Sequence, residues 1–373
     1  MNSDTGVIKM LTVIALLLMP WNEPAAENWP FFRGDINQTG YLAKGTLPEK
    51  PELLWKINVP EGVDSTAAIV GDTAYLGTID GHLLALSMKD GSTKWKYFTK
   101  AVTLKASAAV MNDIVVIGDG EGIVHALDAK TGDKKWTFTT QGEIVSSANI
   151  TGDGKVLIGS NDEHLYCLDL KTGEMKWKYK IDGPINGSPG IVDGMTFVAG
   201  CDGALHVVKI SDGTNVHKVP MGGPSGASAA IEGQNIYVGN MERSFLCIDW
   251  KKGEVVWEYE PPRTASFYSS AALAEGLVVV GGRDRKIHAI HMKDGKGAWV
   301  FQTRGRVDCS PIIIGQRIYC PSGDGNLYCL DLKTGNKLWQ HALGASVTAS
   351  CAYGQGKLIV GNNDGAVYCF GSK

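Results

Sequence analysis

The chain has 373 residues, of which 44% are apolar, and its formal net charge is −3. This composition suffices for a large buried core, and the slightly acidic balance disfavours a non-specific nucleic-acid binder, which is typically basic. Glycine accounts for 47 residues, well above the ordinary share of about 7%, and together with the ten tryptophans this indicates a turn-rich fold rather than a disordered chain.

The N-terminus has the features of a secretory signal peptide. Lys9 precedes an apolar run from Leu11 to Met19, and small residues follow at Ala25 and Ala26. The run is too short to span a bilayer, which takes about 20 apolar residues, and it fits a signal cut near Ala26. We therefore expect residues 1–26 to be removed, and a periplasmic or secreted protein without a transmembrane segment. No cysteine precedes Cys167, so we expect no lipid anchor at the cleavage site.

A period of 40 to 42 residues runs through the rest of the chain. Tryptophan recurs at this spacing, with histidine in one slot: Trp55, Trp95, Trp136, Trp177, His217, Trp257, Trp299 and Trp339. A second series has the same period and contains only hydroxyl residues: Thr66, Ser107, Ser147, Ser188, Ser228, Ser270, Ser310 and Ser350. Two independent series at one spacing predict eight copies of one structural unit.

Each repeat reads as four short strands joined by tight turns. Residues 107–138 contain four apolar runs separated by Asn-Asp, Glu-Gly and Thr-Gly, and glycine supplies the positive φ that hairpin turns require. No 3.6-residue period is sustained, so no long helix is expected. Four antiparallel strands in about 40 residues are typical of a propeller blade. We name the strands A to D from the axis outward, with the hydroxyl residue on A and the tryptophan on D.

The two ends of the repeat series complement each other. The last repeat lacks a strand D, and the segment around Trp55 is a strand D without strands A to C before it. We therefore predict an all-β, eight-bladed propeller with four-stranded antiparallel blades over residues 51–373, as a single domain. The strand around Trp55 completes the last blade and closes the ring. Residues 27–50 form an N-terminal arm, which we expect along the outside of the ring.

The segment ALDAKTGDKKW, from Ala126 to Trp136, strongly resembles the tryptophan-docking repeat of the quinoprotein dehydrogenase superfamily. CLDLKTGEMKW (Cys167 to Trp177) and CLDLKTGNKLW (Cys329 to Trp339) match it equally well. The opening WPFFRG at Trp29 resembles the N-terminal arm of secreted PQQ-like propellers. The likeness covers nearly all of residues 50–370 and implies an eight-bladed PQQ-like propeller of the dehydrogenase or BamB type. A shared fold does not by itself imply an activity.

For the dehydrogenases, the resemblance implies PQQ, a calcium ion held by a Glu and an Asn, a catalytic Asp, and a disulfide between adjacent cysteines. No two cysteines are adjacent here, and the residues closest to the other roles, Glu143, Asn186 and Asp308, have no family motif around them. No nucleophile or metal-ligand motif occurs elsewhere. We therefore expect an exported, non-catalytic binding propeller without a cofactor. One alternative is a PQQ- and calcium-dependent alcohol or sugar dehydrogenase, and another is a BamB-like outer-membrane assembly scaffold.

Packing explains most of the repeated positions. A tryptophan on strand D fills the wedge between two blades, and we expect His217 to dock in the same way. The hydroxyl residues lie on strand A, where they are expected to form hydrogen bonds between blades, to line a polar channel, or both. The eight histidines are scattered and are interpreted as structural or surface residues.

Eight cysteines occur in a chain that is expected to be exported. Four of them share one repeat slot with alanines, which indicates a position for a small apolar residue: Cys167, Cys247, Cys329 and Cys369. A two-residue turn at Asp324 and Gly325 would place Cys320 opposite Cys329. These two cysteines are either free thiols of the core or, if any disulfide exists, its members.

One loop face is expected to carry a ligand site. All eight B–C turns begin with an acidic residue, from Asp80 to Asp364, which predicts a ring of carboxylates. Six of the eight arginines fall in B–C turns or D–A linkers of one sector: Arg243, Arg263, Arg283, Arg285, Arg304 and Arg306. The longest D–A linker adds Phe267 and Tyr268 beside the channel mouth, and Asp308 completes the candidate site.

Arginine favours bidentate recognition of carboxylate, sulfate or phosphate. The alternative is that these arginines form solvated pairs with the acidic turns, worth only about 0–1 kcal/mol each. From the cluster we predict a monomer that binds a protein or an anionic ligand on this face. An acidic glycan is one such ligand, and PQQ is a less favoured one.

Overall fold

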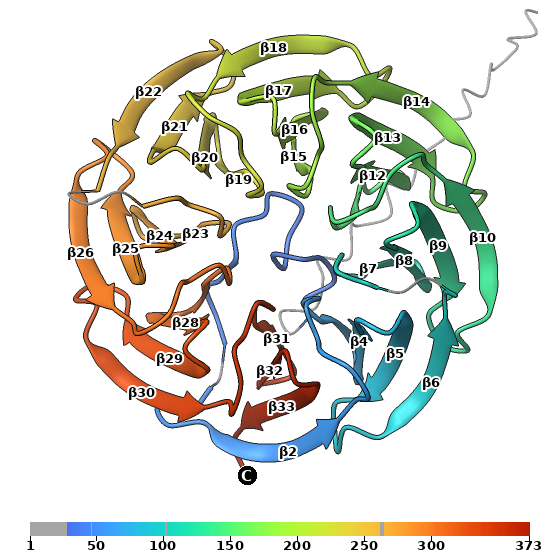
Figure 1. Ribbon diagram of the computed structural model, residues 1–373, viewed down its shortest axis with the longest axis vertical. Helices are drawn as coiled ribbons and strands as arrows, with labels where there is room; N and C mark the ends of the chain where they lie inside the picture. The colour runs from blue at the N-terminus through green and yellow to red at the C-terminus, as the bar shows by residue number, and fades with distance from the viewer. Residues whose placement is uncertain (1–27, 46, 101–102, 262–264) are drawn as a thin grey trace, which may run out of the picture.

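The computed structural model describes residues 28–45, 47–100, 103–261 and 265–373, and its regular elements are β-strands. Within these residues, eight antiparallel sheets stand around one axis as the blades of a propeller, which confirms the predicted fold (Figure 1). The predicted signal peptide lies outside the described residues. In the described part of the chain, no helix is long and apolar enough to cross a membrane.

Each blade contributes one strand to each of four layers. The strands A, next to the axis, are β3 (Ala68–Val70), β7 (Ala109–Met111), β11 (Asn149–Ile150), β15 (Gly190–Val192), β19 (Ala230–Glu232), β23 (Ala272–Ala274), β27 (Ile312–Ile314) and β31 (Ala352–Gly354). The strands B are β4 (Thr73–Gly77), β8 (Ile114–Gly118), β12 (Lys155–Gly159), β16 (Met195–Ala199), β20 (Asn235–Gly239), β24 (Leu277–Gly282), β28 (Arg317–Pro321) and β32 (Lys357–Gly361). The strands C are β5 (His82–Ser87), β9 (Ile123–Asp128), β13 (His164–Asp169), β17 (Ala204–Lys209), β21 (Phe245–Asp249), β25 (Lys286–His291), β29 (Asn326–Asp331) and β33 (Ala366–Gly371). The outermost strands D are β6 (Thr93–Phe98), β10 (Lys134–Thr139), β14 (Met175–Lys180), β18 (Asn215–Pro220), β22 (Glu254–Tyr259), β26 (Gly297–Gln302), β30 (Lys337–Ala342) and β2 (Glu52–Asn58).

The ring closes with the N-terminal strand in the last blade, which confirms the predicted closure. β2 pairs antiparallel with β33, and Trp55 lies opposite Cys369. The last blade is therefore built from both ends of the chain, as the adjacent blue and red strands in Figure 1 show. Opening the ring at this point would require the two strands to separate.

Side chains of strands B and C fill the wedges between blades. These strands are buried over nearly their whole length, as in β4 and β5. At the rim, the indole of Trp177 lies over Gly213 of the next blade and donates its N–H to the carbonyl of Ile210 at 2.9 Å. Gly213 has a φ of +75°, and a Cβ there would lie 2.8 Å from the indole, so this turn requires glycine. The indole hydrogen bond recurs at Trp55, Trp95, Trp136, Trp257 and Trp299. His217 lies over Gly253 in the same way.

The N-terminal arm does not run along the outside of the ring, so that expectation is wrong. Residues 28–42 cross the ring at its axis, where Figure 1 shows them in blue, and follow the inner edges of the strands A. Six strands A each donate one backbone N–H to an arm carbonyl: Ile69 to Trp29, Val110 to Pro30, Ile191 to Ile36, Ile231 to Asn37, Leu273 to Thr39 and Ile313 to Gly40. The arm then forms β1 (Tyr41–Leu42), which adds to β27 in parallel. We call residues 28–42 the collar.

The collar covers a sheet edge that would otherwise be open at the centre of the ring. An edge strand presents backbone N–H groups that need acceptors when they are buried, and the collar carbonyls provide them. Trp29 and Arg33 are 1% and 0% exposed. The Arg33 guanidinium donates to the carbonyls of Ala271, at 3.1 Å, and Pro311. Burial lowers the pKa of Arg33 to about 10. The collar is therefore part of the core.

Candidate functional site

A polar cavity of about 480 Å³ lies on the axis of the propeller. Phe32 of the collar lines it, and the hydroxyl series surrounds it. Each hydroxyl oxygen accepts the backbone N–H of the preceding member of the series, at 2.8 to 3.2 Å, and Thr66 accepts from Ser350 to complete the circle. The series thus ties each blade to the next and also forms a polar wall.

A second ring of side chains lies two positions before each hydroxyl residue, where the D–A linkers enter the strands A. All eight line the cavity: Asp64, Lys105, Val145, Asn186, Gly226, Tyr268, Asp308 and Thr348. We call them the mouth ring. Neighbouring blades never carry the same residue here, in contrast to the uniform hydroxyl ring. At the axis, the residue type therefore varies from blade to blade in the mouth ring, while it is conserved as a hydroxyl residue in the ring beside it.

Two ion pairs set the charge at the mouth. Arg283 Nε lies 2.8 Å from Asp308 Oδ1, Nη2 lies 3.2 Å from Oδ2, and the guanidinium stacks over the Tyr268 ring at 4.2 Å. The hydrogen bond to Asp308 raises the pKa of Arg283, so this arginine stays charged. Lys105 Nζ lies 2.8 Å from Glu143 Oε1. The arrangement presents fixed charges of both signs around one opening.

The structure brings three of the predicted site residues together, namely Arg283, Tyr268 and Asp308. Four other predicted arginines lie in B–C turns or D–A linkers but outside the cavity lining: Arg243, Arg285, Arg304 and Arg306. Arg263 lies outside the described residues. A shared loop face does not bring side chains to one point, because only the positions that enter the strands A face the axis. The predicted six-arginine cluster is thus represented at the cavity by Arg283.

Glu143, Asn186 and Asp308 also meet in this cavity. Each carboxylate already faces a cation, since Glu143 pairs with Lys105 and Asp308 with Arg283. Asn186 Nδ2 is directed at Cys201 Sγ at 3.7 Å. Across the described ranges, no group of three or more His, Cys, Asp and Glu side chains is arranged to hold a metal ion. These donors therefore do not fit the calcium site that the dehydrogenase resemblance would imply.

The family model described as outer membrane protein assembly factor BamB matches residues 48–143, 121–265 and 211–372. This chain belongs to the BamB family. Among curated members, BamB of Shewanella oneidensis is 26% identical over 157 residues, which cover 38% of this chain and 40% of that protein. BamB of Salmonella typhimurium is 24% identical over 240 residues, covering 47% of this chain and 61% of that protein. The matches thus span about half the length of these curated relatives.

Solved structures share the fold of this BamB family member. BamB of Moraxella catarrhalis superimposes with a TM-score of 0.74 at 18% identity, over 86% of this chain and 100% of that chain. A europium-containing methanol dehydrogenase superimposes with a TM-score of 0.80 at 14% identity, over 93% of this chain and 98% of that one. These neighbours confirm the resemblance to PQQ-like propellers, and they show that assembly factors and dehydrogenases share one architecture.

Three buried histidines of this BamB family chain form a repeated triad that the sequence interpretation missed. His206 Nε2 lies 3.0 Å from Asp202 Oδ2, and Nδ1 lies 2.9 Å from the hydroxyl of Tyr179 on the preceding blade. The same arrangement recurs in Tyr97–His125–Asp119 and Tyr259–His288–Asp284. Burial lowers the pKa of His206, which favours the neutral ring. The sequence does contain a pattern for this triad. The three histidines occupy the same position of strand C in alternate blades, and each tyrosine lies two residues after a docking tryptophan.

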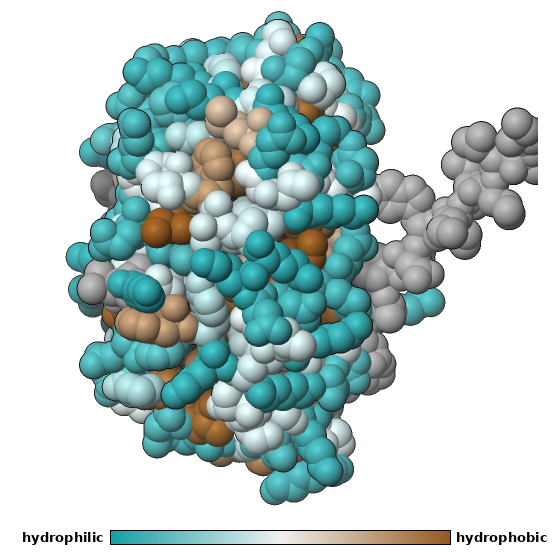
Figure 2. All heavy atoms as spheres, turned by 90° about the vertical axis from the view of Figure 1, so that its right-hand side faces the viewer, coloured by the Kyte–Doolittle hydropathy of each residue, from teal (hydrophilic) through white to brown (hydrophobic). Residues whose placement is uncertain are grey.

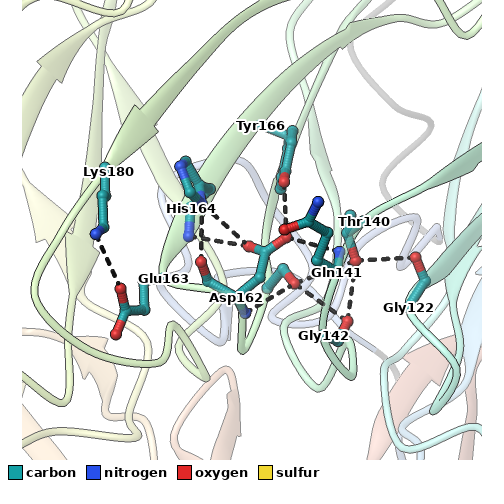
Figure 3. A network of polar contacts seen from close by, with 10 residues as sticks. Gly122, Thr140, Gln141, Gly142, Asp162, Glu163, His164, Tyr166 and Lys180 are labelled. Carbon is teal, nitrogen blue, oxygen red and sulfur yellow. Dashed lines mark hydrogen bonds and ion pairs between the residues drawn. The ribbon is translucent and has the colours of Figure 1, made fainter.

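The acidic B–C turns form the predicted ring of carboxylates only in part, because Glu121, Glu242 and Asp364 are exposed whereas other members of the series turn inward. Asp162 is typical (Figure 3): its side chain is 7% exposed and accepts the N–H of Gln141 at 2.8 Å and the hydroxyl of Tyr166 at 2.7 Å. Asp202 and Asp284 are buried against histidines. The prediction is wrong at these turns because the carboxylates point inward and join the turn to its neighbours.

The eight cysteines, all within the described residues, are free thiols, which is one of the two alternatives left open for Cys320 and Cys329, and the expected register that placed these two residues opposite each other is wrong. Cys320 lies opposite Tyr328, one residue away from the expected register. The Gly325 N–H bonds to the Ser322 carbonyl, and Gly325 has a φ of +78°. The hairpin is therefore a three-residue turn closed by a left-handed glycine, instead of a two-residue turn. Burial raises the pKa of Cys329 to about 11, which makes it an unreactive thiol.

Proposed function

We propose that this chain is a non-catalytic binding scaffold of the periplasm, and that its ligand enters the mouth of the axial cavity. The mouth ring carries this proposal, since it places chain-specific charges around a cavity that the collar lines with Phe32. These positions differ from blade to blade, whereas the hydroxyl ring that ties the blades together is uniform. The curated relatives support a scaffold role and a location at the cell envelope, because their name describes outer membrane protein assembly factors.

The proposed ligand carries one anionic group beside neutral hydrogen-bonding groups. Tyr268 and Asp308 hold the Arg283 guanidinium in a fixed plane, and the side chain remains 36% exposed for an incoming carboxylate or sulfate. The lining also contains three carboxylates, on Asp64, Glu143 and Asp308, which would repel a bare polyanion. An acidic side chain on a protein loop, or a uronic acid of a glycan, combines one anion with uncharged polar groups.

A PQQ- and calcium-dependent dehydrogenase is the weaker candidate. The Glu of its implied calcium site, Glu143, is paired with Lys105, and the residue nearest to its catalytic Asp, Asp308, is paired with Arg283. A metal ion would have to displace Lys105, and Asp308 would have to leave Arg283 to act as a base. The dehydrogenase neighbours share the fold at 14% identity, and a fold at that level supports no activity. We therefore propose no reaction at a quinone for this chain.

The test is binding of alginate oligosaccharides and of a glutamate-containing peptide, measured by calorimetry at low and high salt. Arg283→Ala should weaken binding at least about tenfold, and Arg283→Lys should restore only part of it, because lysine lacks the bidentate fork. Arg243→Ala is the matched control, since it removes an arginine from a B–C turn of the same face, outside the cavity lining and away from β26. Equal loss in both alanine variants, or binding that is independent of salt, would refute the proposal.

A further inference from the structure

The strands D expose a sheet edge all around the rim. Soluble proteins protect such edges with charged residues, lysine above all, because an apolar edge pairs with other chains. Six of the eight strands D contain at least one lysine, and the two that lack it are neighbours, β22 and β26. β26, with the sequence GAWVFQ, has no charged residue at all. On the opposite side of the ring, around the lysine-rich β10 and β14, Figure 2 shows a largely hydrophilic rim.

The position that follows the docking residue shows the contrast most clearly. Seven blades place a polar residue there: Lys56, Lys96, Thr137, Lys178, Lys218, Glu258 and Gln340. β26 has Val300 instead, with 54% of its surface exposed. On β22, Val255 and Val256 are 43% and 53% exposed. Single exposed apolar residues occur on other outer strands, but β22 and β26 combine exposed valines with the absence of lysine.

A cleft of about 380 Å³ lies along this edge. Ala298 and Val300 of β26 line it, together with Lys286 and His288 of β25 and with Tyr259 and Glu260 of the preceding blade. The cleft thus lies beside β26, whose outer edge has no partner strand within the described ranges. In β-augmentation, main-chain hydrogen bonds provide affinity and such a pocket selects alternate side chains of the added strand.

We propose that β26 accepts an extended segment of another protein as an added strand, with β-branched or apolar residues at alternate positions and acidic residues at both ends. The flanks of β26 carry a net positive charge, because Lys293 and Lys296 precede it and Arg304 follows it, while Asp294, 3.4 Å from Lys296, is the acidic residue of the preceding turn. Arg285 adds a further cation at the neighbouring turn. A second copy of this chain is the poorer occupant. Antiparallel pairing of β26 with itself would bring Arg304 of one copy toward Lys296 of the other.

The probe is a fluorescent peptide of alternating valine and threonine with glutamates at both ends, and binding is followed by anisotropy. Val300→Lys should weaken binding at least about tenfold. The substitution suits the fold, since four blades carry lysine in this slot, and circular dichroism checks folding. Val300→Gln, the residue type of Gln340, is a second variant with the same expected loss. Phe98→Lys is the matched control, because Phe98 is 51% exposed on β6, and it should leave binding unchanged.

A version of the peptide with N-methyl groups on alternate backbone nitrogens tests the main-chain hydrogen bonds. It should not bind, because it cannot donate to the edge of β26. The proposal is overturned if the methylated peptide binds as well as the parent, or if Val300→Lys binds like the unchanged protein. It is also overturned, in favour of self-association, if sedimentation detects a dimer that Val300→Lys abolishes.

Discussion

Replacing His217 by tryptophan should stabilise the propeller, because the slot is already built for an indole. His217 lies over Gly253, where a Cβ would come within 2.8 Å of its ring. At six of the seven docking tryptophans the indole N–H bonds to the carbonyl three residues before the turn glycine, as Trp177 does to Ile210 ahead of Gly213. The carbonyl of Trp250 holds this place in the blade that follows His217.

The gain can be worked out from this geometry. An indole buries roughly 50 Å² more apolar surface than an imidazole, worth about 1.3 kcal/mol at ~25 cal/mol per Å². The added hydrogen bond contributes about 1 kcal/mol. Since some of this is lost in ordering the larger side chain, we expect an increase of about 1–2 kcal/mol, which is usual for restoring a consensus residue.

Urea unfolding followed by far-UV circular dichroism measures this change. Trp177→His is the control, because it makes the reverse exchange in the preceding blade and should lower the midpoint. A His217→Trp variant with an unchanged or lower midpoint and the same m-value would refute the docking argument.

Three further predictions address the axis, the triads and the thiols. Ser188→Ala removes the hydroxyl oxygen that accepts the Ser147 N–H at 3.0 Å. It should lower the free energy of unfolding in urea by about 1–3 kcal/mol, whereas Ser188→Thr, which keeps a hydroxyl as at Thr66, should be near neutral. The pKa of His206 is lowered by burial, and that of Asp202 is lowered because the hydrogen bonds and charges of Lys218 and His206 outweigh its burial. The unfolded chain therefore binds more protons than the folded one, so the contribution of the triad to the free energy of unfolding is present above pH 6.5 and is lost as the pH falls below it. In urea unfolding between pH 7 and 5, His206→Asn should lose less stability than the unchanged protein. The same pH dependence in both proteins would contradict the triad. Alkylation of the denatured protein without reductant should modify eight cysteines by mass spectrometry, and a pair that stays unmodified would reveal a disulfide.

The ring could be predicted from the sequence because its determinants repeat. The docking residues and the hydroxyl residues recur at one spacing, and the missing strand D of the last repeat matches the extra strand around Trp55. The position of the collar could not be predicted in the same way. Its contacts with Ile69, Val110 and Ile191 are made by backbone carbonyls, which any residue supplies and which leave no pattern in the sequence.

The candidate site was predicted only in part, for a geometric reason. Loop assignment placed Arg283, Tyr268 and Asp308 on one face, and the structure brings them into contact. The same assignment could not tell that Arg304 and Arg306 lie outside the cavity, since the direction of a side chain depends on where its linker enters strand A. The register of Cys320 was predicted wrongly because an Asp-Gly pair, such as the one that ends at Gly325, occurs in both two- and three-residue turns.

The collar also has a consequence for assembly order. It precedes every blade in the chain, yet its carbonyls accept hydrogen bonds from strands that range from Ile69 to Ile313. A chain that emerges from its N-terminus first therefore makes the collar long before the partners of the collar exist. All six N–H groups are present together only when the chain has folded as far as the seventh blade, and the hydrogen bonds of Arg33 to Ala271 and Pro311 need the sixth and seventh blades. A chain stalled before these two blades would lack both carbonyl acceptors of the Arg33 guanidinium, so burial of this side chain marks late assembly of the ring.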